Sequence, residues 1–176
     1  MATHVALLRG VNLGKANKVP MAELRALATR LGYGNPRTLL NSGNLVLVSA
    51  EDTGTVAARL EAGLAADLGV KVRVFVLTVD ELAGLVASEP FGDRVTEPSR
   101  LLLAVADAGG LARLRVLADR DWGPEALVVT DRAGWIWCPD GISAGLLAEA
   151  ALKALGQGGT TRNLATARKL LDLAAA

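Results

Sequence analysis

The sequence is poor in the residues that most often bind metals or carry out catalysis. Its 176 residues include one cysteine, Cys138, and one histidine, His4. A single cysteine excludes an internal disulfide and a cysteine-based zinc site, and a single histidine excludes histidine clusters. His4 stands in or beside an expected strand. The apolar residue next to Cys138, Trp137, predicts that Cys138 is a buried, inert thiol. We therefore expect no metal site and no histidine-based triad.

Aromatic residues and long apolar runs are scarce as well. Aromatics make up 3% of the chain, so the core must be built from Leu, Val and Ala. No apolar run is long enough to cross a bilayer, and the first ten residues lack the basic start and apolar stretch of a signal peptide. With 51% apolar and 21% charged residues, the composition is typical of a soluble globular protein. The expected location is the cytoplasm, with no membrane partner.

Charge is unevenly distributed, although the formal net charge is +1. Residues 1–40 hold six bases and one acid, Glu23, whereas residues 41–160 hold ten bases and sixteen acids. The last sixteen residues return to a net charge of +2. Basic ends around an acidic middle favour a local anion-binding face over a nucleic-acid binder that is basic throughout. The alternative is a solvated surface whose charges never cluster.

The hydrophobic pattern of residues 1–88 predicts the order β-α-β-β-α-β. A strand over 4–9 precedes a helix that starts at Pro20 and stops at Gly32. Two β-rich runs then flank Ser42-Gly43, a two-residue hairpin signal. A helix over 55–68 and a strand over 72–78 complete the split βαβ order of a ferredoxin-like unit.

Residues 99–176 follow the same order without its final strand. Strands are expected over 100–106, 125–130 and 134–139, and helices over 109–118 and 143–155. A helix over 162–174 is expected to close the chain. The predicted fold is α+β, with two ferredoxin-like (split βαβ) halves over 1–88 and 99–176, each an antiparallel sheet with helices packed on one face.

The stretch "VALLRGVNLGKANKVPMAELR", residues 5–25, contains the first candidate site. In a split βαβ unit the first and second strands are parallel, so the loop over 9–18 and the turn over 41–44 follow strands that end at one edge of the sheet. The first helix also begins there, and free N–H groups with the helix dipole favour an anion. The glycine spacing fits neither a P-loop nor a Rossmann fingerprint, so no cofactor is expected. A long loop whose polar residues hold its own backbone, and a plain hairpin turn, are the structural alternatives.

The same residues resemble a known family. "LLRGVNLGKANKVPMAELR", "LLNSGNLVLVS", "CPDGI" and "TTRNLATARKLLDL" are similar to the signatures of the bacterial domain-of-unknown-function family 1697, whose members are uncharacterised. The resemblance implies two ferredoxin-like halves and no established activity. This chain departs from the family pattern after "PDGI". Similar proteins carry a basic-serine-basic stretch there, whereas this chain has Ser143-Ala144-Gly145. The difference weakens an anion site at 141–146.

The expected C-terminal helix allows two interpretations. Thr160 or Thr161 can cap it, with Arg162, Thr166 and Lys169 on one helical face. It is then a docked amphipathic helix with a polar outer face. Alternatively, Arg162 and Asn163 fold back against the first loop and complete a polar pocket.

The function predicted from the sequence is binding of an anionic ligand, a nucleotide or a nucleic-acid phosphate. The expected ligand-binding residues are Arg9, Gly10, Asn12, Lys15, Lys18, Ser42, Gly43, Asn44, Arg162 and Asn163. Sheet-face RNA binding is disfavoured, because the third strand has no aromatic residue; Trp135 and Trp137 either stack bases or cover the core. Two other classes stay open: a protein-interaction module, and a small phosphate- or acyl-transferase using Ser42 and Lys15. No general base is evident, so no catalytic residue is assigned.

Overall fold

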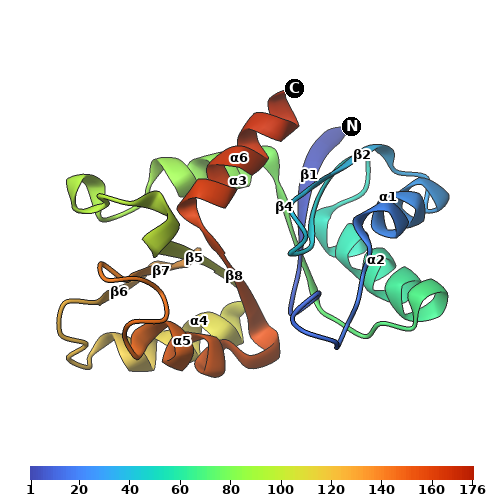
Figure 1. The fold of residues 1–176 in the computed structure, drawn as a ribbon. Coiled ribbons are helices and arrows are strands. Elements are labelled where there is room, and N and C mark those ends of the chain that lie inside the picture. The colour runs from blue at the N-terminus through green and yellow to red at the C-terminus, as the bar shows by residue number, and fades with distance from the viewer. The chain divides into compact units, whose positions relative to one another are not determined.

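The computed structural model describes residues 1–176, which form two compact units (Figure 1). The first unit comprises Met1–Ala83 and Lys169–Ala176, and the second comprises Gly84–Arg168. Each contains one four-stranded sheet whose neighbouring strands are all antiparallel. None of the helices is long and apolar enough to span a bilayer.

The first unit has the predicted β-α-β-β-α-β order. Its elements are β1 (Ala2–Leu8), α1 (Met21–Arg30), β2 (Gly34–Leu39), β3 (Asn44–Ser49), α2 (Thr53–Leu68) and β4 (Val74–Thr78), followed by the start of α3 (Val79–Ala87). The strand order is β2-β3-β1-β4. Because β3 pairs antiparallel with both β1 and β2, those two strands are parallel to each other, as the split βαβ pattern requires.

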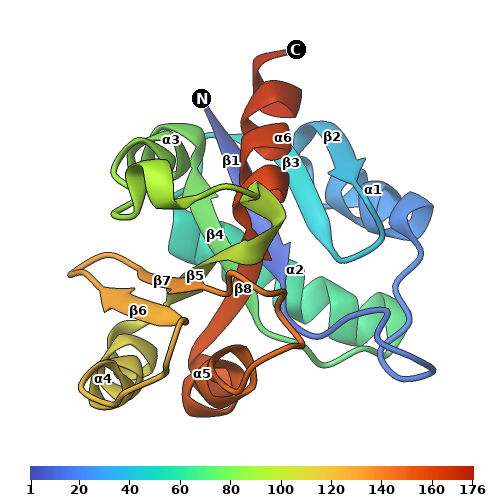
Figure 2. The same cartoon turned by 60° about the vertical axis from the view of Figure 1, so that its left-hand side comes forward.

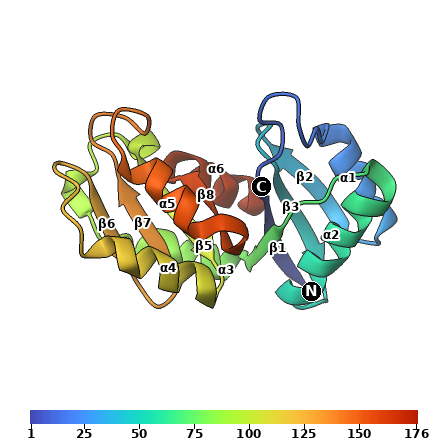
Figure 3. The ribbon, with the colours of Figure 1, turned by 90° about the horizontal axis from the view of Figure 1, so that it is seen from below.

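Helices α1 and α2 pack on one face of the first sheet (Figure 3). Alternate residues of β1 and β3, including Ala6, Leu8 and Leu45, form a buried cluster with apolar residues of α1 and α2. Local sequence sets the helix ends. Asp52 accepts a hydrogen bond from the Thr55 N–H at 2.7 Å and caps α2, and Gly69, at φ 66°, ends it as predicted.

The second unit also forms a complete split βαβ sheet. After the rest of α3 and two short 3-10 helices, η1 (Gly92–Arg94) and η2 (Pro98–Arg100), come β5 (Leu101–Ala106), α4 (Ala108–Ala118), β6 (Ala126–Val129), β7 (Gly134–Trp137) and α5 (Leu147–Leu155). The 3-10 helix η3 (Gly156–Gly158), β8 (Gly159–Asn163) and the start of α6 (Leu164–Ala175) follow. The order is β6-β7-β5-β8, and α4 and α5 lie side by side on one face (Figure 2).

Strand β8 corrects three predictions. The expectation that the second half lacks its final strand is wrong, because residues 159–163 pair antiparallel with β5. Thr160 and Thr161 are strand residues rather than caps. The cap of α6 is Asn163, whose side-chain oxygen accepts a hydrogen bond from the Thr166 N–H at 2.8 Å. Arg162 lies in the strand, so its predicted place on the helical face is also wrong.

Smaller boundaries differ for local reasons. Helix α1 begins at Met21, with Pro20 outside it in an extended conformation. Helix α5 begins at Leu147 instead of 143, because residues 140–146 form turns. The thiol of Cys138 is fully buried, as predicted, and Trp135 and Trp137 are buried as expected for tryptophans that cover a core.

Candidate anion-binding edge of the first unit

The loop after β1 and the turn after β2 lie at the same edge of the first sheet. Leu7 and Leu39 both stand opposite Asn44, the first residue of β3. The Leu8 N–H donates to the Gly43 carbonyl oxygen at 2.9 Å, so the β2–β3 turn is bonded directly to the end of β1. Strand order alone therefore predicts which two segments share this edge.

The turn itself is longer than predicted. It contains four residues, Leu40–Gly43, instead of two, and both Leu40 (φ 58°) and Gly43 (φ 87°) have left-handed backbone conformations. A Cβ atom on Gly43 would lie 2.7 Å from Cγ2 of Val11 and 2.8 Å from Cβ of Leu8. Gly43 is thus required for close packing of the turn on β1, a structural role in addition to the predicted ligand contact.

Asn12 joins the loop to the turn. Its side-chain amide nitrogen donates to the carbonyl oxygens of Asn41 at 2.7 Å and Val19 at 2.9 Å, and its side-chain oxygen accepts from the Val19 N–H at 2.8 Å. Val19 precedes Pro20 at the start of α1. One side chain therefore connects three segments of the edge: the loop, the turn and the entry to the helix.

Asn44 organises the turn from within. It is fully buried, and its amide nitrogen donates to the Leu39 carbonyl oxygen at 3.0 Å and to Oγ of Ser42 at 2.9 Å. Ser42 is exposed, so Asn44 orients a hydroxyl group at the surface. Buried amides are normally satisfied in this way, which makes Asn44 a positioning residue at this edge.

Alternating left-handed residues shape the rest of the loop. Gly10 (φ 66°), Asn12 (φ 56°), Gly14 (φ 67°) and Asn17 (φ 51°) all have positive φ, and Leu13 pairs with Ala16 across a tight turn. No atom lies within 4 Å of a Cβ placed on Gly10 or Gly14. Backbone conformation, instead of steric crowding, is the reason for glycine at these two positions.

Three basic residues, Arg9, Lys15 and Lys18, belong to this edge. Lys15 and Lys18 are exposed and make no ion pair. Arg9 is half-buried, and its N–H donates to the Arg73 carbonyl oxygen at 2.9 Å. Glu23 is the one acid in residues 1–50. Helix α1 begins nearby without a side-chain cap, and Glu23 in its first turn is the acid closest in sequence to the positive end of its dipole.

The two predicted residues from the end of the chain belong to the second unit. Arg162 donates to Oγ1 of Thr160 at 3.0 Å and to the Thr161 carbonyl oxygen at 2.7 Å, and burial lowers the pKa of its guanidinium to about 10. Asn163 caps α6. Their participation in the edge of the first unit stays a prediction.

Residue types revealed the polar side chains of this edge but not their partners. Asn41 and Val19 contribute backbone atoms, which no sequence pattern identifies. The sequence predicted Asn12 as a ligand-binding residue, and that role stays a prediction; its bonds to Asn41 and Val19 are a structural role that the sequence did not indicate.

A family model described as "Protein of unknown function (DUF1697)" matches residues 1–135. The chain belongs to this family. The matched residues of this chain include both the 9–18 loop and the 41–44 turn. The match confirms the resemblance inferred from the motifs. No curated protein matches the chain.

A solved structure supports the fold of this DUF1697 protein. That solved structure is of a protein described as the conserved bacterial protein SP0830 from Streptococcus pneumoniae, and its chain is 22% identical to the present one. The match covers 98% of each chain with a TM-score of 0.79. At this identity the likeness concerns the fold alone, and it confirms the α+β class.

Proposed function

We propose that the first unit binds an anionic ligand, a nucleotide or a nucleic-acid phosphate, at the edge formed by the 9–18 loop and the 41–44 turn. Lys15, Lys18 and Arg9 supply positive charge. The hydroxyl of Ser42, oriented by Asn44, supplies a polar contact, and the open loop backbone at Gly10 lets a ligand approach closely.

The observation that carries this proposal is the set of bonds made by Asn12. Because its amide holds the loop, the turn and the helix entry together, Lys15 and Lys18 extend from a backbone that is already ordered. Ordering before binding reduces the entropy lost when a ligand binds. Two lysines without an ion pair on this ordered loop then favour an anion.

The test is a thermal-shift titration with inorganic phosphate, ATP and a short single-stranded RNA. A ligand at a hundred times its dissociation constant stabilises by about 2.7 kcal/mol, which raises the melting temperature of a chain of this size by roughly 5 to 10 °C. We expect this shift for at least one of the three anions, and we expect it to disappear in the Lys15→Ala/Lys18→Ala double variant.

The matched control is Lys71→Ala/Lys169→Ala. Both of these lysines are exposed and belong to the first unit, so this variant loses the same charge without changing the 9–18 loop or the 41–44 turn. A control that retains the ligand shift supports the proposed site. Equal loss in both variants indicates nonspecific attraction to charge, and flat curves for all three anions with the unmodified protein overturn the proposal.

A further inference from the structure

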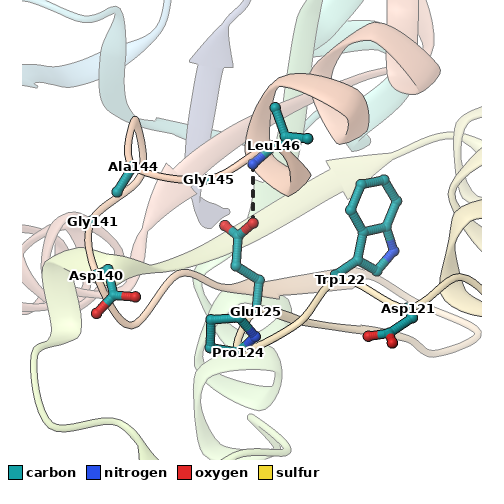
Figure 4. Close-up of a pocket in the computed structure, with 9 residues that line it drawn as sticks. All are labelled: Asp121, Trp122, Pro124, Glu125, Asp140, Gly141, Ala144, Gly145 and Leu146. Atoms are coloured by element: carbon teal, nitrogen blue, oxygen red, sulfur yellow. Dashed lines mark hydrogen bonds between the residues drawn. The ribbon is translucent and has the colours of Figure 1, made fainter.

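The second unit contains a pocket of about 360 Å³ that includes Asp140 and Gly141 of the "CPDGI" motif in its lining (Figure 4). Residues from two connecting segments line it: 121–125, between α4 and β6, and 140–146, between β7 and α5. Both segments belong to the second unit, so the pocket is complete within that unit.

The pocket is acidic and has no basic residue in its lining. Three carboxylates line it, those of Asp121, Glu125 and Asp140. None of them makes an ion pair. The side chain of Arg100 donates to the carbonyl oxygen of Pro139 at 2.6 Å, next to Asp140 in the chain, and forms no ion pair there. Backbone N–H groups bond to Asp121 and Glu125, but no ion pair offsets the negative charge of the pocket.

Glu125 has one satisfied and one unsatisfied carboxylate oxygen. Its Oε1 atom accepts hydrogen bonds from the N–H groups of Leu146 at 3.1 Å and Leu147 at 3.2 Å, at the start of α5. Its Oε2 atom is buried and has no nitrogen or oxygen donor. The buried thiol of Cys138 also interacts with this carboxylate, and a thiol is a weak donor. A buried carboxylate oxygen without a strong donor is costly, so a cation that entered the pocket would stabilise it.

The remaining walls are apolar and aromatic. Trp122 is half-buried, and its indole N–H donates to the Leu117 carbonyl oxygen at 2.8 Å, which fixes the orientation of the ring. Leu146, on the other connecting segment, is 74% exposed and also lines the pocket. The carboxylates do not form a group of three that could hold a metal ion. Carboxylates beside an aromatic ring and apolar walls suit an organic cation, because the carboxylates pair with the charge and the apolar walls receive the attached carbon chain.

We infer that this pocket binds an organic cation, an ammonium or guanidinium group on a short alkyl chain. The charged group pairs with Glu125 and Asp140, and the alkyl part packs against Trp122 and Leu146. This site takes a ligand of opposite charge to the one proposed for the first unit, and it does not depend on that proposal.

The experiment is an NMR titration of the full chain with 1,4-diaminobutane at low salt, with 1,4-butanediol as the uncharged control of the same length. The chain has three tryptophans, and Trp122→Phe identifies the indole signal of Trp122. We expect saturable shifts of that indole and of the Leu146 and Leu147 amides with the diamine, no saturable shifts with the diol, and weaker binding as salt is added.

Two variants test the carboxylates. Asp140→Asn removes an exposed charge and should weaken diamine binding roughly two- to fivefold, the usual size for an exposed ion pair. Glu125→Gln should weaken it roughly tenfold or more, since it removes the half-buried charge. Asp131→Asn is the control, because Asp131 is exposed in the same unit outside the pocket.

The outcomes separate clearly. Saturable diamine binding that weakens in Asp140→Asn and not in Asp131→Asn supports the inference, and this comparison holds even if Glu125→Gln fails to fold. Equal weakening in the two aspartate variants, saturable shifts with the diol, or shifts that never saturate with the diamine overturn it.

Discussion

The side-chain amide of Asn12 donates to the backbone carbonyl oxygen of Asn41 across 29 residues of sequence, at 2.7 Å. The same amide group makes two further bonds to Val19. The first loop and the β2–β3 turn are therefore one structural unit, and a change at either segment should be felt at the other.

Replacing Asn12 by glycine tests this connection. Asn12 and Asn17 both have left-handed backbones, at φ 56° and 51°, so glycine relieves the same backbone strain at either position. Asn12→Gly loses three short hydrogen bonds, whereas Asn17→Gly loses one long bond, of 3.4 Å, to the Gly10 carbonyl oxygen. We expect Asn12→Gly to be less stable than Asn17→Gly by about 1 to 3 kcal/mol in urea unfolding. Equal stabilities would show that the Asn12 bonds contribute no net free energy.

Gly43 should tolerate alanine worse than the other left-handed glycines of this edge. A Cβ at position 43 meets Val11 and Leu8 at 2.7 and 2.8 Å, while a Cβ at position 14 meets nothing within 4 Å. Gly14→Ala should therefore cost about 1 to 2 kcal/mol from backbone strain alone. Gly43→Ala adds about 1 to 3 kcal/mol for overpacking. Thermal unfolding of both variants measures the difference, and a Gly43→Ala variant as stable as Gly14→Ala contradicts the tight packing.

The first unit was predictable because its signals are local. Pro20 stands just before α1, Gly69 ends α2, and β3 is an apolar run of leucine and valine that needs no distant residue to be recognised. Strand β8 was missed because its threonines are as suitable for a helix cap as for a strand. Pairing with β5, more than 50 residues earlier in the chain, decides between the two.

The polar edge was predictable in position but not in detail. Strand order is sufficient to bring the loop and the turn together, and residue type is sufficient to suggest charge and polarity. The partners of Asn12 are backbone atoms, and the role of Glu125 depends on N–H groups 21 and 22 residues further along the chain. Such contacts follow from packing, which a single sequence does not specify.

Glu125 and Gly145 should show strong energetic coupling. A Cβ on Gly145 would lie 2.1 Å from Oε1 and 2.4 Å from Cδ of Glu125, so Gly145→Ala must displace the carboxylate from the start of α5. We expect Gly145→Ala and Glu125→Ala each to destabilise by about 1 to 3 kcal/mol, because both remove the acceptor of the Leu146 and Leu147 N–H groups. The double variant should be more stable than the sum predicts, by about 1 to 2 kcal/mol.

A second glycine controls for the effect of alanine itself. Gly109 lies in the first turn of α4, where a Cβ would have its nearest neighbour, a flexible arginine side chain, at 3.3 Å. Gly109→Ala should be additive with Glu125→Ala in urea unfolding. Additivity of Gly145→Ala with Glu125→Ala would mean that the carboxylate does not lie against the backbone at position 145.

The thiol of Cys138 should make the protein less stable at alkaline pH. Burial, reinforced by hydrogen bonding to Glu125 and its charge, raises the pKa of Cys138 to about 12, whereas an unfolded cysteine ionises near about 8.5. Above about pH 8.5 the thiol of the unfolded state loses a proton that the folded state keeps. The contribution of Cys138 to stability is therefore complete below about pH 8.5 and is lost as pH rises toward 12. Between pH 9 and 10 the loss approaches about 1.4 kcal/mol per pH unit.

Comparison with Cys138→Ala isolates this single thiol. Alanine leaves a cavity whose cost does not depend on pH, so the free-energy difference between the two proteins should shrink from pH 8 to pH 10 as the unfolded thiol of the unmodified chain ionises. Urea unfolding at pH 7, 8, 9 and 10 measures that difference.

In the folded protein at pH 8 the thiol of Cys138 should also resist a disulfide reagent such as 5,5′-dithiobis(2-nitrobenzoate) and react after unfolding, because it is fully buried. Rapid labelling of the folded chain, or a difference that stays constant from pH 8 to 10, would show that the folded state does not hold the proton as tightly as its burial requires.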